Sequence, residues 1–237
     1  MAVDIKFAIA NSNALKDEVY RLRYEVYVDE FGYENREEFP DGLEKDIYDE
    51  HSIHVAGLFN NKIMGTIRMI MNSEIGFPID EIGGKSFYRE KPHPSKIIEV
   101  SRFAVSSSFR RRKEDRVYGV RSYIKKSEGG VLPEGGKSLF ENERRVKPEI
   151  VSGLLKNLYQ LTRQMELTHW YVMLEKRMYH MLKRMGYFFR QIGEPVEFHH
   201  AIRTPYLGVI EEMDEHFSQN KPEFFKMIND GLVVFDR

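Results

Sequence analysis

Two charged side chains, Glu99 and Arg102, lie in the middle of an otherwise apolar run, IIEVSRFAV, at 97–105. Burying an unpaired charge costs several kcal/mol, so a buried strand that carries both must supply a partner for each. Candidate partners lie upstream, where charged residues again fall among apolar ones: Arg23, Asp46, Asp49 and Arg68. Charges of alternating sign on core-facing elements predict a polar cleft, the kind of place where proton transfer or binding of a charged ligand occurs.

The elements that must position these charges follow from hydrophobic periodicity. Apolar residues at helical spacing predict a helix over about 13–30, with Arg23 and Tyr27 bordering its apolar stripe. Strands are predicted at 53–59 and 63–71, because Asn-Asn between them suits a two-residue hairpin turn. The run at 97–105 is the third strand. Arg23 and Arg68 are therefore expected to face inward.

The C-terminal half alternates helices and strands. After a long basic connection from Ser106 to Pro148, a helix is predicted to begin at Pro148, which the first helical turn tolerates. Further strands are predicted at 168–173, 188–192 and 201–210, with helices at 174–185, closed by Gly186, and between 217 and 230. This order predicts an α/β fold in a single domain over 1–237, with a central mixed sheet flanked by helices.

Composition limits the classes of function. The 237 residues contain no cysteine, which excludes disulfides, thiolate nucleophiles and Cys-ligated zinc. No apolar run approaches the length of a membrane span and no signal peptide begins the chain, so a cytoplasmic protein is expected. Charge is unevenly distributed: residues 1–60 hold 14 acidic and 6 basic side chains, whereas residues 106–148 hold 6 acidic and 12 basic ones. This polarity indicates an anionic partner for the basic segment, unless that segment is only a solvated loop.

Four motifs in register resemble the acyl-homoserine lactone (autoinducer) synthases of the GNAT acyltransferase superfamily. They are LRYEVY at 22–27 with FGY at 31–33, Glu44-x-Asp46-x-x-Asp49, Arg68, and Glu99-x-Ser101-Arg102-Phe103. Tyr33 stands where those synthases have Trp, and the insertion at about 107–148 has no counterpart in them. The chain is therefore more similar to the long-chain N-acyl amino acid synthases and to the acyltransferases associated with PEP-CTERM/exosortase systems, whose tail the segment 193–206 resembles.

The resemblance implies a GNAT-like fold with a splayed sheet, and transfer of a fatty acyl group from a thioester to an amine. The expected donor is an acyl carrier protein, or coenzyme A as cosubstrate, and the acceptor is an amine or amino acid. Three alternatives remain: an autoinducer-type lactone synthase, a CoA-dependent N-acetyltransferase, and a GNAT-like module that only binds an acyl ligand.

Amide formation from a thioester needs a neutral amine, a polarised carbonyl and a leaving thiolate. Glu99 is the candidate acceptor of the amine proton. Pairing with Arg102 or Arg68 would lower its pKa and weaken it as a base, so electrostatic anchoring of the ammonium before deprotonation is the alternative role. Ser101, Arg102 and Phe103 complete the expected catalytic set. The expected acceptor-binding residues are Arg23, Tyr27, Tyr33, Asp46, Asp49 and Arg68. Among them, Arg23 and Arg68 are predicted to clamp a carboxylate, unless they belong to a salt-bridge network that only stabilises the fold.

Strand geometry adds a prediction. Glu99 and Arg102 fall on opposite faces of a regular strand, so their convergence on one cleft requires a bulge between them.

The donor is expected to contact a short segment after this strand. It comprises Val105, Arg110, Arg111, Arg112 and Lys113. Cationic side chains stand there in place of the Gly-rich turn that cradles a pyrophosphate in GNAT enzymes, which favours an acidic carrier protein over free coenzyme A. No aromatic-interleaved platform accompanies these cations, so nucleic-acid binding is not expected.

Several other residues are expected to have structural roles. Leu182 occupies the position, four residues before Gly186, where many GNAT enzymes place a Tyr that protonates the leaving thiolate; Tyr179 is expected to pack. The methionines at 173, 178, 181 and 185 are expected in the core, with contact to an acyl chain as the alternative. The histidines lack the spacing of a metal site, and no metal is expected.

Overall fold

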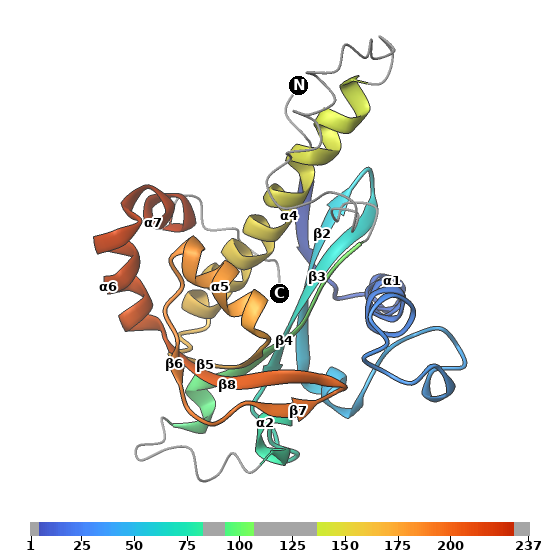
Figure 1. Ribbon diagram of the computed structural model, residues 1–237, viewed down its shortest axis with the longest axis horizontal. Coiled ribbons are helices and arrows are strands. Elements are labelled where there is room, and N and C mark those ends of the chain that lie inside the picture. Colours follow the sequence, from blue (N-terminus) through green and yellow to red (C-terminus); the bar gives the residue numbers. More distant parts are fainter. Residues whose placement is uncertain (1–4, 83–92, 107–136, 230–237) are drawn as a thin grey trace, which may run out of the picture.

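The computed structural model describes residues 5–82, 93–106 and 137–229, with side chains from 149 onward in the last range (Figure 1). Eight strands form the sheet: β1 (Ile5–Ile9), β2 (Ser52–Phe59), β3 (Lys62–Met71), β4 (Ile97–Val105), β5 (His169–Leu174), β6 (Arg190–Gln191), β7 (Val196–Phe198) and β8 (Ala201–Val209). The α-helices are α1 (Asn13–Tyr24), α2 (Pro78–Glu81), α4 (Lys137–Gln164), α5 (Lys176–Met185), α6 (Ile210–Asn220) and α7 (Pro222–Asn229). A π-helical turn, η1 (Glu25–Glu30), continues α1, and short 3₁₀ turns are η2 (Arg36–Glu38), η3 (Ile47–His51) and η5 (Pro94–Lys96).

The strand order is β1-β2-β3-β4-β5-β8-β6, with β7 added to β8. Neighbouring strands are antiparallel except β4 and β5, which run parallel. The prediction of a mixed sheet flanked by helices is confirmed. Within the described ranges, no helix combines the length and the apolar character needed to cross a bilayer.

Most predicted elements are present, and the differences have local causes. Strand β4 has the predicted bounds, and the Asn60-Asn61 turn adopts positive φ at both residues, as a two-residue hairpin requires. Helix α4 begins at Lys137, so the prediction that Pro148 opens it is wrong and the proline lies inside the helix. Strands β1 and β7 were not predicted, the strand at 188–192 shrinks to two residues, and the terminal helix is two helices.

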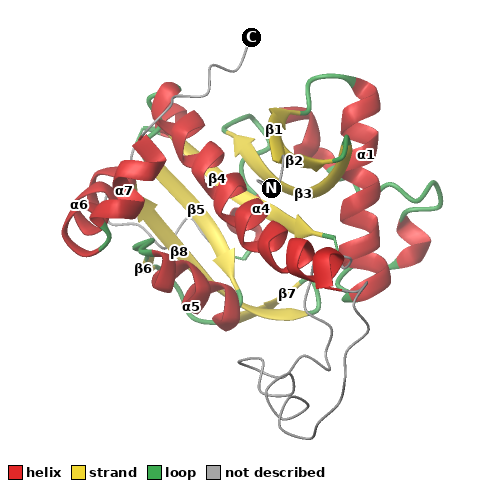
Figure 2. Ribbon diagram, turned by 90° about the horizontal axis from the view of Figure 1, so that it is seen from above, coloured by secondary structure: helices red, strands yellow, loops and turns green. Residues whose placement is uncertain are grey.

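The two faces of the sheet carry different helices. Alternation along β2 sends Val55 to the cluster under α4 and Ala56 to the cluster under α1. Figure 2 shows α4 lying across one face of the sheet, with α1 on the far side of β2 and β3. Helix α4 approaches closely because Gly65 lies beneath it: a Cβ there would lie 2.7 Å from Ile150 Cγ2 and 2.9 Å from Leu154 Cδ1.

The sheet opens between its two parallel strands. The β4–β5 register runs from Ile97 opposite His169 to Val100 opposite Val172 and stops there, although both strands continue. Strand β5 remains paired with β8 as far as Leu174 opposite Thr204. The second half of β4 therefore diverges from β5, as the predicted splay requires. This gap leads from one face of the sheet to the other.

Candidate active site

A bulge in β4 brings Glu99, Ser101 and Arg102 to one site. Arg68 lies opposite Ser101 and Thr66 opposite Ala104, so the single residue Ile67 faces two residues of β4. Arg102 adopts φ +50°, a left-handed conformation that L residues rarely take outside such irregularities. Without the bulge its side chain would point toward α4. With the bulge, the Arg102 side chain lies beside Ser101 on the face of the sheet that α1 covers. The predicted bulge between Glu99 and Arg102 is therefore confirmed.

Arg23 is fully buried at the centre of a charge network. Its Nε donates to Glu44, while Nη1 and Nη2 donate to Asp49 Oδ1 and Oδ2 at 2.6 and 3.0 Å. Burial alone would raise the pKa of the Glu44 carboxyl, but Arg23 and Arg102 lower this pKa to about 2. The Nε, Nη1 and Nη2 atoms of Arg23 therefore all donate to carboxylates of this chain.

Arg68 and Arg102 extend this network. Arg68 Nη1 donates to Asp46 at 2.7 Å and to Asp49 at 2.9 Å, and its Nε donates to Ser101 Oγ at 3.0 Å. Arg102 donates through Nε to Glu44 at 2.9 Å and through Nη2 to Glu34 at 3.0 Å. A longer contact of 3.4 Å joins Arg102 to Asp46. Three arginines thus face four carboxylates, one of which, Glu34, also lies 2.9 Å from His199 Nδ1.

This geometry does not support the expected carboxylate clamp. Arg23, Asp46 and Asp49 do not line the cavity described below, and Arg68 reaches it with its charge already matched by aspartates. The salt-bridge alternative describes these residues better. Such a network holds the acidic loop at residues 34–49 against α1, β3 and β4.

Glu99 stands apart from the network. It is 2 % exposed, and its Oε2 accepts a hydrogen bond of 2.9 Å from the Ile79 N–H of α2. In the described part of the chain no cation lies within ion-pair distance of it. Burial raises the pKa of this carboxyl to about 8, despite the opposing hydrogen bond from Ile79 and the charge of Arg68. Arg68 and Arg102 lower the pKa of Glu99, as expected of these partners, but the effect of burial is larger.

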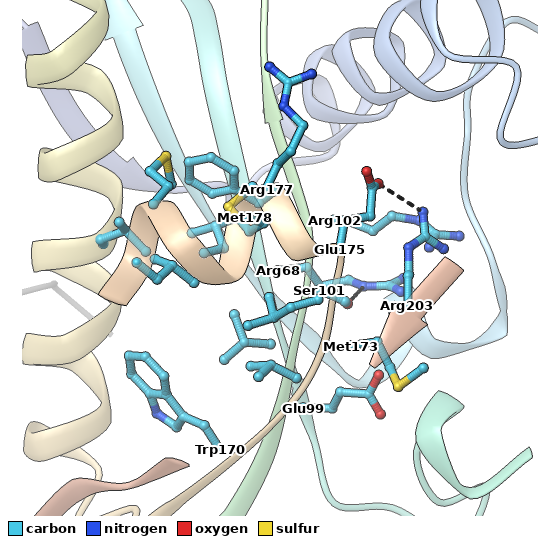
Figure 3. A pocket seen from close by; sticks show the side chains of 18 of the residues that line it. Arg68, Glu99, Ser101, Arg102, Trp170, Met173, Glu175, Arg177, Met178 and Arg203 are labelled. Carbon is cyan, nitrogen blue, oxygen red and sulfur yellow. Dashed lines mark hydrogen bonds and ion pairs between the residues drawn. The ribbon is translucent and has the colours of Figure 1, made fainter. Parts of the chain in front are cut away.

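A cavity of about 500 Å³ passes through the gap between β4 and β5. Its polar side is lined by Glu99, Ser101 and Arg102, together with Arg68 and Arg203. Its apolar side reaches α4 and α5 and is lined by Leu155, Leu158, Trp170, Met178, Met181, Leu182 and Phe189. Figure 3 shows the same division, with the labelled charged groups on one side and apolar side chains toward α4. The volume is typical of a site for a small molecule.

Other predicted residues are placed as follows. Tyr27, Tyr33 and Phe103 line the cavity, and the Tyr27 hydroxyl donates to the Phe103 carbonyl at 3.1 Å. Val105 is buried in the core near α4 and does not line the cavity. Residues Arg110, Arg111, Arg112 and Lys113 lie outside the described residues.

The residues expected in structural roles divide between core and cavity. Tyr179 stacks on Tyr206 with ring centroids 4.7 Å apart, as expected of a packing residue. Met173, Met178 and Met181 line the cavity, which favours the alternative of acyl-chain contact for them. In the described ranges, no group of three His, Asp or Glu side chains could hold a metal ion.

Sequence reasoning missed a second charged group at the cavity, built around Arg203 of β8. Its guanidinium lies over the Tyr33 ring, 5.1 Å from the centroid, and Nη1 donates to the Phe198 carbonyl at 2.7 Å. Tyr33 in turn donates to Glu175 Oε1 at 2.8 Å. A signal was available, because Arg203 interrupts the largely apolar run of β8 just as Arg102 interrupts β4.

Comparisons with known proteins identify chains that are similar to this one in sequence profile or fold. A family profile described as an acetyltransferase (GNAT) domain matches residues 22–118. Among solved structures, the acyl-homoserine lactone synthase LasI matches with a TM-score of 0.63 at 13 % identity, covering 100 % of both chains. FeeM, an N-acyl amino acid synthase from uncultured soil microbes, matches with a TM-score of 0.63 at 16 % identity, covering 92 % of this chain and 98 % of its own.

BjaI, a CoA-dependent acyl-homoserine lactone synthase solved with SAM and isopentyl-CoA, matches with a TM-score of 0.61 at 16 % identity. The match covers 99 % of this chain and 94 % of BjaI. A comparison with curated protein sequences finds no match. The profile covers less than half of the chain, and the solved structures share 13–16 % identity with it; together they confirm the predicted GNAT-like fold.

Proposed function

Starting from a GNAT acyltransferase fold, we propose that this chain transfers a fatty acyl group from a carrier-protein thioester to the amine of an amino acid-like acceptor. The observation that carries the proposal is the cavity through the sheet, which has an apolar side and a polar side that meet at Glu99. An acyl chain suits the apolar side, which is rich in adaptable methionines. The amine suits the polar side.

The proposed reaction forms one bond and breaks another. The amine nitrogen attacks the thioester carbonyl, the C–N bond forms, the C–S bond breaks, and the thiolate leaves with the bonding electrons. The proton lost by the amine passes to the ionised form of Glu99. Because burial raises the pKa of this carboxyl to about 8, the ionised form is the minor one at neutral pH, and the transfer rate should rise as pH approaches 8. The β4 backbone beyond Val100 is no longer paired with β5, and this free edge is the proposed source of hydrogen-bond donors for the thioester oxygen.

The position from which many GNAT enzymes protonate the leaving thiolate holds no acid in this chain. Leu182 occupies the position from which many GNAT enzymes supply a Tyr, and Tyr179 is stacked on Tyr206. We therefore propose that the thiolate leaves unprotonated.

The carrier protein is the proposed donor because of the basic stretch from Arg110 to Lys113, and CoA remains the alternative. The test supplies the purified full chain with long-chain acyl carrier protein, long-chain acyl-CoA or acetyl-CoA, together with amino acids, and identifies products by mass spectrometry. A long-chain N-acyl amino acid is the expected product, formed faster from the carrier protein. Faster turnover of acetyl-CoA would favour a small-molecule acetyltransferase, and an acyl-homoserine lactone formed from SAM would favour an autoinducer synthase.

A further inference from the structure

Arg203 differs from the other buried arginines around the cavity in having little negative charge beside it. Arg23, Arg68 and Arg102 each contact two or more carboxylates of the network. The only carboxylate recorded near Arg203, among the described residues, is Glu175, whose Oε1 lies 4.0 Å from Nη2.

The environment of Arg203 disfavours the charged form of its guanidinium. Its side chain is 10 % exposed, and burial lowers its pKa, an effect that Glu175 and the neighbouring tyrosines do not offset. Within the described ranges, this guanidinium donates one hydrogen bond, to the Phe198 carbonyl. A guanidinium has five N–H donors, so most of its capacity remains available to a ligand.

The same contacts hold the group in position. The Tyr33 ring supports one face of the guanidinium, and the Phe198 carbonyl fixes Nη1. Arg203 lines the cavity that Glu99 also lines, and Figure 3 shows it on the polar side with Glu175 and Met173. A buried guanidinium in a cavity, with little negative charge beside it, is suited to bind a carboxylate bidentately.

We propose that Arg203 binds the carboxylate of the acceptor, which makes the acceptor a free amino acid rather than an amine without a carboxylate. The inference rests on the proposed acyl transfer and assigns to Arg203 the role first expected of Arg23 and Arg68. The carboxylates that already pair with those two arginines disfavour another anion there. Arg203 is thus a specificity-determining residue.

The test compares each standard L-amino acid with its own carboxamide, which keeps the amine and removes the negative charge. With saturating long-chain acyl thioester, wild-type protein should prefer the acid. Arg203→Gln should lower kcat/KM for the acid by about 10- to 100-fold, mainly through KM, because a hydrogen-bonded ion contact is lost. The carboxamide rate should change little, and Arg203→Lys should fall between the two.

Arg190→Gln is the matched control, because Arg190 is an exposed arginine on the neighbouring strand β6, paired with Glu212 and outside the cavity lining. It should behave as wild type. Equal rates for acid and carboxamide in wild type, or an unchanged preference in Arg203→Gln, would overturn the inference while leaving acyl transfer intact.

A second measurement separates failure of the inference from failure of the proposed function. Calorimetric titration of the amino acids into protein without donor should give heat of binding in wild type and Arg190→Gln but not in Arg203→Gln. Binding that survives in Arg203→Gln, or no binding of any amino acid to wild type, would overturn the carboxylate site. Binding without any acyl transfer would leave that site standing and contradict the proposed reaction.

Discussion

Glu99 is deeply buried and has no ion-pair partner among the described residues, and this combination sets its chemistry. A partner would have held the carboxyl ionised and weakly basic, whereas burial raises its pKa to about 8. The arginines that were expected beside Glu99 instead serve the aspartates and glutamates of the network. The salt-bridge network and Glu99 thus lie close together but have different roles: the network stabilises the fold, and Glu99 is the proposed proton acceptor.

The pH dependence of stability follows from this raised pKa. Between the ordinary carboxyl pKa and about 8, the folded state holds the Glu99 proton and the unfolded state does not. Stability from this group is therefore present at low pH and is lost as pH rises toward 8, with a slope of at most about 1.4 kcal/mol per pH unit. Relative to wild type, Glu99→Gln should gain stability across this window in urea unfolding. A difference that stays constant with pH would contradict the assignment.

Removing one carboxylate from the network should lower the free energy of unfolding much more than removing an exposed carboxylate. Asp49→Asn leaves Arg23 and Arg68 undercompensated in the core and should lower the free energy of unfolding by about 3–5 kcal/mol. Asp29→Asn breaks the exposed pair with Arg36 and should cost less than about 1 kcal/mol. Similar losses in the two variants, measured by urea unfolding, would show that the network does not stabilise the fold.

At the scale of elements, the bulge and the splay of β4 build the site. The sequence predicts the bulge because Glu99 and Arg102 are three residues apart on a strand and must meet one cleft. It does not predict the partner of each charge, because strand alternation fixes only the face to which a side chain points. The assignment of Arg68 to Asp46 and Asp49 depends on η3, whose path through the acidic loop no periodicity specifies.

The elements missed or misplaced have different causes. Strand β1 is a short alternating segment, IKFAI, that becomes a strand by pairing with β2, a long-range contact. Helix α4 runs through Pro148, where proline was interpreted as a start signal. Arg203 was overlooked because the run at 201–210 was interpreted only as a strand. The same charge-in-apolar-run pattern, applied to β8 as it was to β4, would have identified it.

Helix α5 should set the length of acyl chain that the cavity accepts. Met181 lines the apolar side, so Met181→Trp should fill part of it and lower the rate with long-chain donors at least about tenfold while sparing short-chain ones. Met165, 38 % exposed and outside the lining, gives the control Met165→Trp. A parallel loss with donors of every length would indicate a folding defect rather than a chain-length limit.

At the scale of the whole molecule, the cavity joins the two faces of the sheet. The face toward α4 and α5 is apolar, and the face toward α1 and α2 holds the charges. A thioester in the gap would thus present its carbonyl to an amine while its acyl chain remains in apolar surroundings. This arrangement is the central claim of the proposed function.

Single-turnover acyl transfer by Glu99→Gln tests that claim most directly, because glutamine keeps the shape of the side chain but cannot accept the proton. Donor binding should be unchanged, and the transfer rate should fall by about 10²- to 10⁴-fold. Transfer at the wild-type rate with normal donor binding would contradict the account, because Glu99 would then take no part in the reaction.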